Sequence, residues 1–279
     1  MFTPIIDYDK VWVKREDLCF SPPAPPFSKC RGILSHFKTL KEQGIETVGY
    51  VDTTISMAGW GVSWACREVG MKAVIFGPTY KKKPSTYETL VQHWRRWEEM
   101  GAEIIPIQAT RTGVNWYIGR RILKEKYGEK ALLLPLGLPF AETIEETEKE
   151  FVKTIRSLPT PPKTIVLCIG SGTICSGIWR GMNQLEMRDT KLYGITCHNA
   201  ILAEEKIKRI EEKSGVKTNG LFKSPISFQV ILSVYNYTSR PKENAPFPCN
   251  PYYDLKAWEW LMQNRSQLEE PILFWNIGQ

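Results

Sequence analysis

The sequence is poor in the residues that build metal sites and disulfide frameworks. It has three histidines, His36, His93 and His198, and none lies in an HExxH motif or at another spacing typical of metal ligands. Its seven cysteines are odd in number and contain no CxxC pair, so we expect reduced thiols in a cytosol. A zinc site and a disulfide-stabilised secreted fold are therefore disfavoured.

Several catalytic and targeting motifs are also missing. There is no GxSxG, which disfavours a serine hydrolase, and no GxxxxGK[ST], which disfavours a nucleoside triphosphatase. The glycines after the strand predicted at 164–169 have the wrong offset for a dinucleotide-binding fingerprint. The first ten residues do not have the pattern of a signal peptide, and no apolar run approaches the ~18 residues of a membrane span, so we expect a cytoplasmic protein.

The composition is that of a globular protein with an excess of positive charge. The 279 residues are 42% hydrophobic and 24% charged, enough for one large or two modest domains. Lys and Arg number 37 against 30 Asp and Glu, and the formal charge of +7 hints at a phosphate-bearing partner such as a nucleic acid. The run at 81–83 is either a solvated loop or a phosphate contact. The ten tryptophans either pack in the core or stack on bases beside Arg95, Arg96, Arg120 and Arg121.

Short β-rich segments alternate with amphipathic segments along the chain. Strands are predicted at 11–14, 47–51, 73–76, 103–107, 131–134, 164–169, 191–196 and 271–275. Helices are predicted near 30–43, 60–70, 85–100, 112–127, 141–157, 175–186, 201–213 and 252–264. This alternation is typical of an α/β fold with parallel sheets flanked by helices. The proline-rich segments 21–27 and 158–162 are predicted loops.

Lys29 stands at the predicted start of a helix, after the strand and charge run VWVKREDL at 11–18. A helix N-terminus disfavours a cation, and burial would add to this effect, so the pKa of Lys29 would be lowered. A neutral lysine amine is the nucleophile that forms a Schiff base. A single lysine at a helix start is, however, more often a surface residue.

A glycine-containing loop follows the strand predicted at 164–169. The segment TIVLCIGSGTICSGIWRG places Gly170, Ser171, Gly172 and Thr173 between a buried strand and a helix. Successive backbone N–H groups and the helix N-terminus can hold an anion there. The pattern indicates a phosphate site, with a tight turn as the alternative.

These segments, in this order, resemble the fold-type II pyridoxal phosphate enzymes, the tryptophan synthase β-like family. The nearest pattern is that of 1-aminocyclopropane-1-carboxylate deaminase and D-cysteine desulfhydrase, in which KRED is followed by GGNK; here Pro-Phe-Ser precedes Lys29. The family's Ser-Asn-His turn is matched by Ser56, Met57 and Ala58. The C-terminal CNPYYDLK carries Tyr253 and Asp254 on the family's pattern, and Asn276 stands where relatives have a histidine.

The resemblance implies a fold, a cofactor and roles for the site residues. A smaller domain would span 45–140, and a larger one 1–44 plus 141–279. Pyridoxal 5'-phosphate would be held by Lys29 as a Schiff base and by Gly170, Ser171, Gly172 and Thr173 at its phosphate, and Lys29 would also be the general base. Ser56 would position the substrate carboxylate or the cofactor. Tyr253 would lie near the substrate, Asp254 at the pyridine nitrogen, and Asn276 at the turn that closes the site. Met57 cannot replace the asparagine hydrogen bond to the ring hydroxyl.

The resemblance leaves three functions open. The first is β-elimination, β-replacement or deamination of a small amino acid substrate. The second is a transferase or lyase that acts on amino-acid-modified thymine in bacteriophage DNA, which would place the protein in a host cytoplasm and suits the basic, tryptophan-rich composition. The third is a non-catalytic binding protein with this fold, for which Met57 is the best support. A homodimer is expected by analogy with the family.

Overall fold

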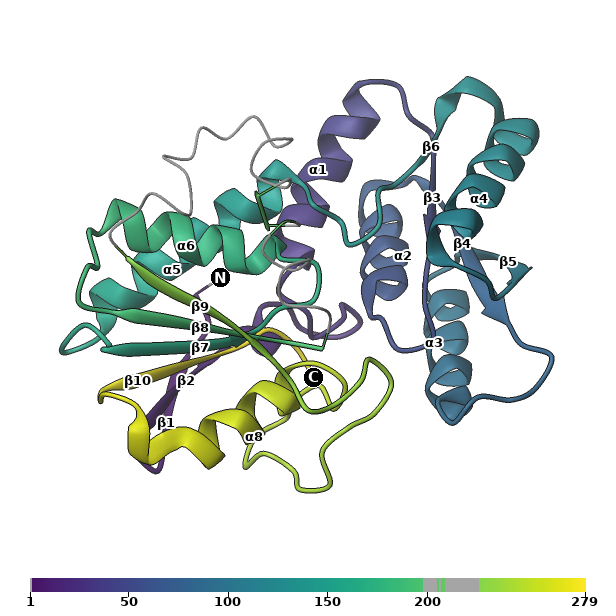
Figure 1. Cartoon of the computed structure of the whole chain (residues 1–279). Helices are drawn as coiled ribbons and strands as arrows, with labels where there is room; N and C mark the ends of the chain where they lie inside the picture. Colours follow the sequence, from purple (N-terminus) through teal and green to yellow (C-terminus); the bar gives the residue numbers. More distant parts are fainter. Residues whose placement is uncertain (1, 198–204, 206, 209–225) are drawn as a thin grey trace. The chain divides into compact units, whose positions relative to one another are not determined.

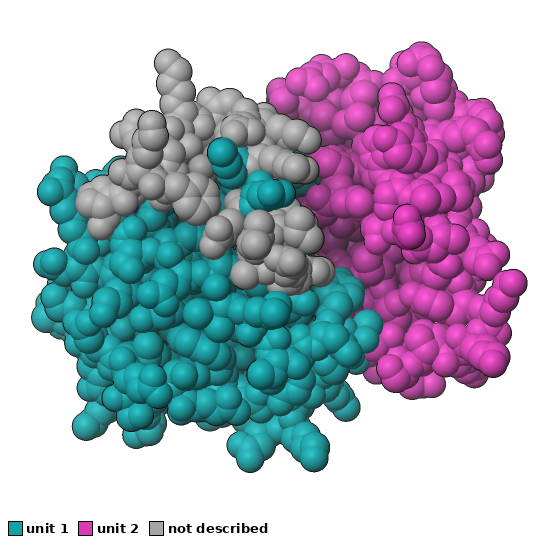
Figure 2. All heavy atoms as spheres, viewed as in Figure 1, with its two compact units in different colours: residues 1–21, 26–29, 139–279 teal, residues 22–25, 30–138 magenta. Residues whose placement is uncertain are grey.

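The computed structural model describes residues 2–197, 205, 207–208 and 226–279. They form two compact units (Figure 2), the first made of Met1–Ser21, Pro26–Lys29 and Pro139–Gln279 and the second of Pro22–Pro25 and Cys30–Leu138. Each unit is an α/β structure with its own sheet, as the sequence predicts. His198 and almost all of the helix predicted at 201–213 lie outside the described residues.

Unit 2 is built on a four-stranded parallel sheet with the strand order β5-β4-β3-β6. Its strands are β3 (Thr47–Val51), β4 (Lys72–Thr79), β5 (Glu103–Gln108) and β6 (Ala131–Leu133). Its helices are α1 (Cys30–Glu42), α2 (Ala58–Val69), α3 (Tyr87–Glu99) and α4 (Thr112–Tyr127), followed by the short 3-10 helix η2 (Gly128–Lys130). The helix α4 packs on one face of this sheet, while α2 and α3 lie on the other (Figure 1).

Unit 1 is built on a six-stranded sheet with the order β1-β2-β10-β7-β8-β9. Its strands are β1 (Ile5–Tyr8), β2 (Val11–Arg15), β7 (Thr164–Cys168), β8 (Lys191–Thr196), β9 (Ser227–Leu232) and β10 (Ile272–Asn276). Its helices are α5 (Ala141–Ser157), α6 (Thr173–Gln184) and α8 (Asp254–Asn264), with the short 3-10 helices η1 (Glu16–Leu18) and η3 (Arg265–Gln267). In Figure 1, α5 and α6 cover one face of the sheet and α8 the other.

Helices cover both faces of the large sheet, and successive side chains of its central strands point to opposite faces, so both sets of side chains are buried. In β7, Ile165 and Leu167 join the core under α5 and α6, whereas Val166 and Cys168 join the core under α8. The central strands therefore consist of unbroken apolar runs, and the loops at their ends are left to carry polar groups.

Three features differ from the expectation. β1 and β9 were not predicted, and β1 pairs antiparallel with β2 rather than parallel. Asp9 and Lys10 connect these two strands with φ values of 53° and 63°, a two-residue hairpin turn that contains no glycine to mark it in the sequence. The expected domain division placed 30–44 with the larger domain, but α1 packs against α2, and the chain passes into unit 2 after Lys29. The second division falls before Pro139, close to the expected residue 141.

Candidate active site

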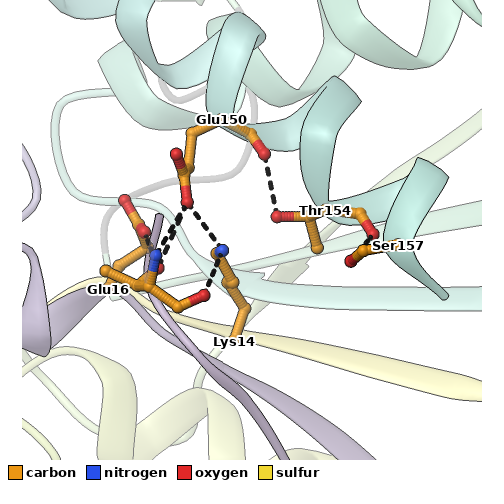
Figure 3. Close-up of polar contacts among 6 residues, drawn as sticks. Lys14, Glu16, Glu150, Thr154 and Ser157 are labelled. Atoms are coloured by element: carbon orange, nitrogen blue, oxygen red, sulfur yellow. Dashed lines mark hydrogen bonds and ion pairs between the residues drawn. The ribbon is translucent and has the colours of Figure 1, made fainter. Parts of the chain in front are cut away.

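The charge run of β2 and η1 is buried, unlike the solvated edge that such a run usually forms. Lys14 is completely buried, and its Nζ lies 2.7 Å from Oε1 of Glu150 in α5 (Figure 3). The same Nζ donates to the backbone oxygen of Thr3 at 2.7 Å, and the Thr3 hydroxyl donates to Glu16. A buried lysine must be compensated in this way, since an uncompensated charge in the interior is very unfavourable.

The second half of the run connects to the end of β10. Arg15 binds the Asp17 carboxylate through two hydrogen bonds, Nε to Oδ1 at 2.8 Å and Nη2 to Oδ2 at 2.6 Å. These bonds to Asp17 raise the pKa of Arg15. Asn276 donates from Nδ2 to Asp17 Oδ1 at 2.9 Å and to the Pro248 oxygen at 3.0 Å. The KRED segment thus holds the end of β10, where Asn276 is the last residue, through the contact with Asp17.

Lys29 reaches the glycine-containing loop. Its Nζ donates to Oγ of Ser171 over 2.7 Å, and Ser171 Oγ lies 3.0 Å from Oγ1 of Thr173. Burial lowers the pKa of Lys29 to about 7. The neutral, nucleophilic form of the amine is therefore well populated at neutral pH.

The loop itself is shaped by one glycine. Gly172 has a φ of +93°, a conformation that a side chain disfavours, and it immediately precedes α6. Ser176 donates both its N–H and its hydroxyl to the Gly172 oxygen, so the first turn of α6 is closed on this residue. Gly170 lies under the ring of Tyr253, to which a Cβ at residue 170 would come within 3.6 Å. The hydroxyls of Ser171 and Thr173 therefore lie at a glycine turn before the N-terminus of α6, a place where backbone N–H groups can bind an anion.

Tyr253 and Asp254 lie at the start of α8. The hydroxyl of Tyr253 lies 2.7 Å from that of Tyr237. The Asp254 carboxyl is 2% exposed and accepts the N–H of Ile277 at 3.1 Å. Burial raises its pKa to about 8. Asp254 therefore joins α8 to the segment after β10, which the sequence pattern did not indicate.

The C-terminal residues hold the segment that leads to Lys29. Ser28 donates its N–H to the Ile277 oxygen at 3.0 Å, and Gln279 donates its N–H to the Pro26 oxygen at 3.2 Å. Phe27 pairs with Gly278 as an isolated antiparallel bridge. The Pro-Phe-Ser segment is thus positioned by backbone pairing, and Ser28, which sequence reasoning did not select, is buried beside Lys29.

Ser56 and Met57 lie at the start of α2, in unit 2. Ser56 Oγ accepts the N–H of Ala58 at 3.1 Å, and Met57 is buried. A further residue at this helix start was missed: Asp52, just after β3, accepts the N–H of Gly59 at 2.6 Å and that of Thr53 at 2.8 Å. Burial raises the pKa of Asp52 to about 7. The sequence feature that could have identified Asp52 is an acidic residue between a predicted strand and a predicted helix.

Comparison with known proteins identifies the family. A family model described as pyridoxal-phosphate dependent enzyme matches residues 2–232. The chain belongs to this family. The glycyl-dTMP PLP-dependent decarboxylase of Pseudomonas phage M6 is 34% identical to this pyridoxal-phosphate dependent enzyme over 288 residues, 99% of the chain and 98% of the relative.

Solved structures show the same fold at lower identity. The crystal structure of an ACC deaminase homologue has a TM-score of 0.79 and 19% identity, covering all of this chain and 89% of the other. Diaminopropionate ammonia lyase of Escherichia coli, in its apo form, has a TM-score of 0.67 and 14% identity, covering all of this chain and 83% of the other. The α/β fold predicted from the sequence, and its resemblance to this family, are confirmed.

The described residues of unit 1 fit the cofactor of this family, pyridoxal phosphate. The amine of Lys29, with its lowered pKa, touches a glycine loop that suits a phosphate. Ser28 Oγ and Asn276 Oδ1 are buried polar atoms with no hydrogen-bond partner among the described residues. Such atoms are costly unless a ligand or water satisfies them. Within the same described residues, no cluster of His, Cys, Asp and Glu could hold a metal, and no helix is long and apolar enough to cross a membrane.

Proposed function

We propose that this enzyme removes the carboxylate of an amino acid group carried on a thymidine nucleotide. The observation that carries this proposal is the 34% identity, over 99% of the chain, to a protein named as a glycyl-dTMP decarboxylase. The match extends over 99% of the chain and 98% of the relative, so it is not confined to a part of either protein. The reaction breaks the bond between Cα and the carboxylate, releases CO₂, and places a proton on Cα.

Lys29 is proposed as the central catalytic residue. Bound pyridoxal phosphate supplies an electron sink for the pair left at Cα when CO₂ departs. The Lys29 amine would hold the cofactor covalently and, once released by the substrate amine, would exchange a proton at Cα. Its pKa of about 7 suits both tasks, since proton transfer is fastest for a group whose pKa lies near the working pH.

The remaining residues are proposed to bind and orient. Gly170, Ser171, Gly172 and Thr173 would hold the cofactor phosphate through backbone N–H groups and two hydroxyls. Tyr253, whose ring covers Gly170, would lie near the substrate.

Three further residues are proposed to take part. Asp254 would pair with the pyridine nitrogen, Asn276, whose Oδ1 is unsatisfied, would lie at the turn that closes the site, and Ser56 would position the substrate carboxylate or the cofactor. Burial raises the pKa of Asp254 to about 8, and a protonated ring nitrogen beside it would lower that pKa and favour the carboxylate form.

Elimination or deamination of a free amino acid is the second candidate. The solved relatives with the same fold include an ammonia lyase and an ACC deaminase homologue, but their identities of 14% and 19% support the fold alone. A homodimer and a place in the cytoplasm, of a phage-infected host if the chain is viral, stay predictions.

The deciding experiment offers the purified, cofactor-loaded enzyme both kinds of substrate. A glycyl-bearing thymidine nucleotide should release CO₂, and Lys29→Ala should abolish the release. D-Cysteine and 1-aminocyclopropane-1-carboxylate should yield no sulfide or ammonia above the level of the Lys29→Ala variant. Ammonia or sulfide from the free amino acids, without CO₂ from the nucleotide, would reverse the choice between the candidates.

A further inference from the structure

The positive charge of the chain is concentrated in one unit. Residues 30–138 contain 16 Lys and Arg against ten Asp and Glu, whereas the rest of the chain contains 21 against 20. Almost all of the formal charge of +7 therefore belongs to unit 2. The glycine loop and Lys29 lie in unit 1, so a cofactor phosphate held there does not account for this excess.

Within unit 2, the cations at the amino-terminal edge of the sheet are neutralised. Lys72 and Lys126 both bind Glu103, Lys130 binds Glu46, and Lys124 lies 3.1 Å from Glu129. The hydrogen bonds from Lys126 and Lys72 lower the pKa of Glu103 to about 2. These cations are engaged in the protein's own ion pairs.

The carboxyl-terminal edge of the same sheet is different. Because β3, β4 and β5 are parallel, the loops that follow them lie at one edge. The loop after β4 carries Lys81, Lys82 and Lys83, and the loop after β5 carries Arg111, all exposed. None of these four cations is in an ion pair among the described residues.

The two loops are held next to each other. Thr79, the last residue of β4, is paired with Gln108, and the N–H of Ala109 donates to the Thr79 oxygen at 2.8 Å. Tyr80 is tied to the loop after β3, since its hydroxyl lies 2.5 Å from Oγ1 of Thr54. The acidic residue nearest in the chain, Glu88, lies in the first turn of α3. The four cations therefore lie on two loops that begin side by side, and this pair of loops is called here the basic edge.

Exposed aromatic rings accompany the basic edge. Tyr80 is 39% exposed beside the lysines, and Tyr117, on α4 just after Arg111, is 68% exposed. The tryptophan rings of this unit near arginines are already covered, with Arg96 4.3 Å from the Trp60 ring and Arg120 5.7 Å from the Trp116 ring. Exposed aromatic rings beside cations without ion pairs are what a nucleic acid strand contacts, through stacking and through its phosphates.

We propose that the basic edge of unit 2 docks DNA, so that the substrate nucleotide is presented as part of a DNA strand. This inference rests on the proposed function, which names a thymidine nucleotide. A free nucleotide would contact few of these cations, whereas a strand brings a phosphate every few ångströms along the edge.

The test measures binding of a fluorescent DNA duplex, and of one of its single strands, to the cofactor-loaded enzyme over a series of salt concentrations. The triple variant K81Q/K82Q/K83Q is compared with K124Q/K126Q/K130Q, which loses the same charge from the amino-terminal edge. We expect the first triple variant to lose at least about tenfold in affinity near 0.1 M salt and to reduce the salt slope by about two to three, while the control stays near the wild type. Thermal unfolding and the cofactor absorbance confirm that both variants are folded.

Equal losses in the two triple variants, or no binding of either DNA form by the wild type, would overturn the basic edge as a DNA-docking surface. CO₂ release from the free glycyl nucleotide separates the two proposals. If that release persists in the first triple variant while release from modified DNA falls, both proposals stand. If the wild type releases CO₂ from the nucleotide but does not bind DNA, only the docking surface is lost.

Discussion

Lys29 Nζ lies 2.7 Å from Ser171 Oγ, although 142 residues separate the two in the chain. This contact joins the amine expected to carry the cofactor to the loop expected to hold its phosphate, and both groups belong to unit 1. One molecule that carries both an aldehyde and a phosphate could therefore bind the Lys29 amine through its aldehyde and the loop through its phosphate. Measurements of cofactor binding therefore test both proposed roles, that of Lys29 and that of the loop.

The first prediction concerns Lys29→Ala. The purified variant should lack the visible absorbance of lysine-bound pyridoxal phosphate and should retain no cofactor after borohydride reduction followed by denaturation. In the wild type, the rate at which added cofactor becomes covalently bound should rise with pH, with a midpoint near the Lys29 pKa of about 7, because only the neutral amine reacts. Lys153→Ala, at an exposed lysine of α5, should match the wild type. Reducible cofactor in the Lys29 variant would show that another lysine carries it.

The second prediction compares two glycines of the same loop. Gly172→Ala should destabilise the protein by about 1–2 kcal/mol, because an alanine disfavours the left-handed φ of +93°. It should also weaken cofactor binding, since the strained residue leads into the first turn of α6. Gly170→Ala places its Cβ 3.6 Å from the Tyr253 ring, an ordinary contact, and should leave stability nearly unchanged. Urea unfolding and cofactor titration of both variants measure the difference, and equal effects would contradict this account of the loop.

The third prediction concerns the buried pair of Lys14 and Glu150. Lys14→Met leaves the Glu150 carboxylate buried without its cation and should cost about 3–5 kcal/mol. Adding Glu150→Gln removes that charge while keeping an oxygen for the Thr3 N–H, which lies 3.1 Å from Oε1. The double variant should therefore be more stable than Lys14→Met, with a coupling of about 1–3 kcal/mol in a double-mutant cycle of urea unfolding. Additive losses would mean that the two charges act independently.

The sequence predicted the parts of this protein that are governed by local patterns. The apolar run at 164–169 indicated a buried strand, and the glycines after it indicated a loop before a helix, which the structure has at Gly172; that this loop holds a phosphate stays a prediction. The predicted helix at 141–157 is α5 with the same bounds. Such features depend on hydrophobic period, glycine and chain order, all of which can be read without knowing what packs where.

The features that were not predicted depend on contacts between distant residues. Glu150 looks like one of several acids on a solvated helix, and only folding brings it to Lys14, 136 residues away. The same holds for Asp254, whose partner Ile277 follows a later strand. A sequence shows that a group can carry a charge but not that it is buried, and burial is what raises the pKa of Asp254 and makes Glu150 and Lys14 depend on each other.

The last prediction uses Asp254, whose burial raises its pKa from 3.8 to about 8. Between these values the folded protein binds a proton that the unfolded chain releases, so this group's contribution is complete below pH 4 and is lost as the pH rises toward 8. The cofactor-free wild type should therefore lose stability from pH 5 to pH 7, by up to about 1.4 kcal/mol per pH unit from this residue. Asp52, with a raised pKa of about 7, adds a loss of the same sign. His93, with a pKa lowered by burial to about 4, offsets part of this loss below about pH 6.5, whereas most of the opposing effect of Lys29 falls above pH 7. Asp254→Asn should reduce the loss in urea midpoint from pH 5 to pH 7, whereas the control Asp189→Asn, at an exposed residue, should not. If the urea midpoints of all three proteins change with pH in parallel, Asp254 is ionised in the folded protein.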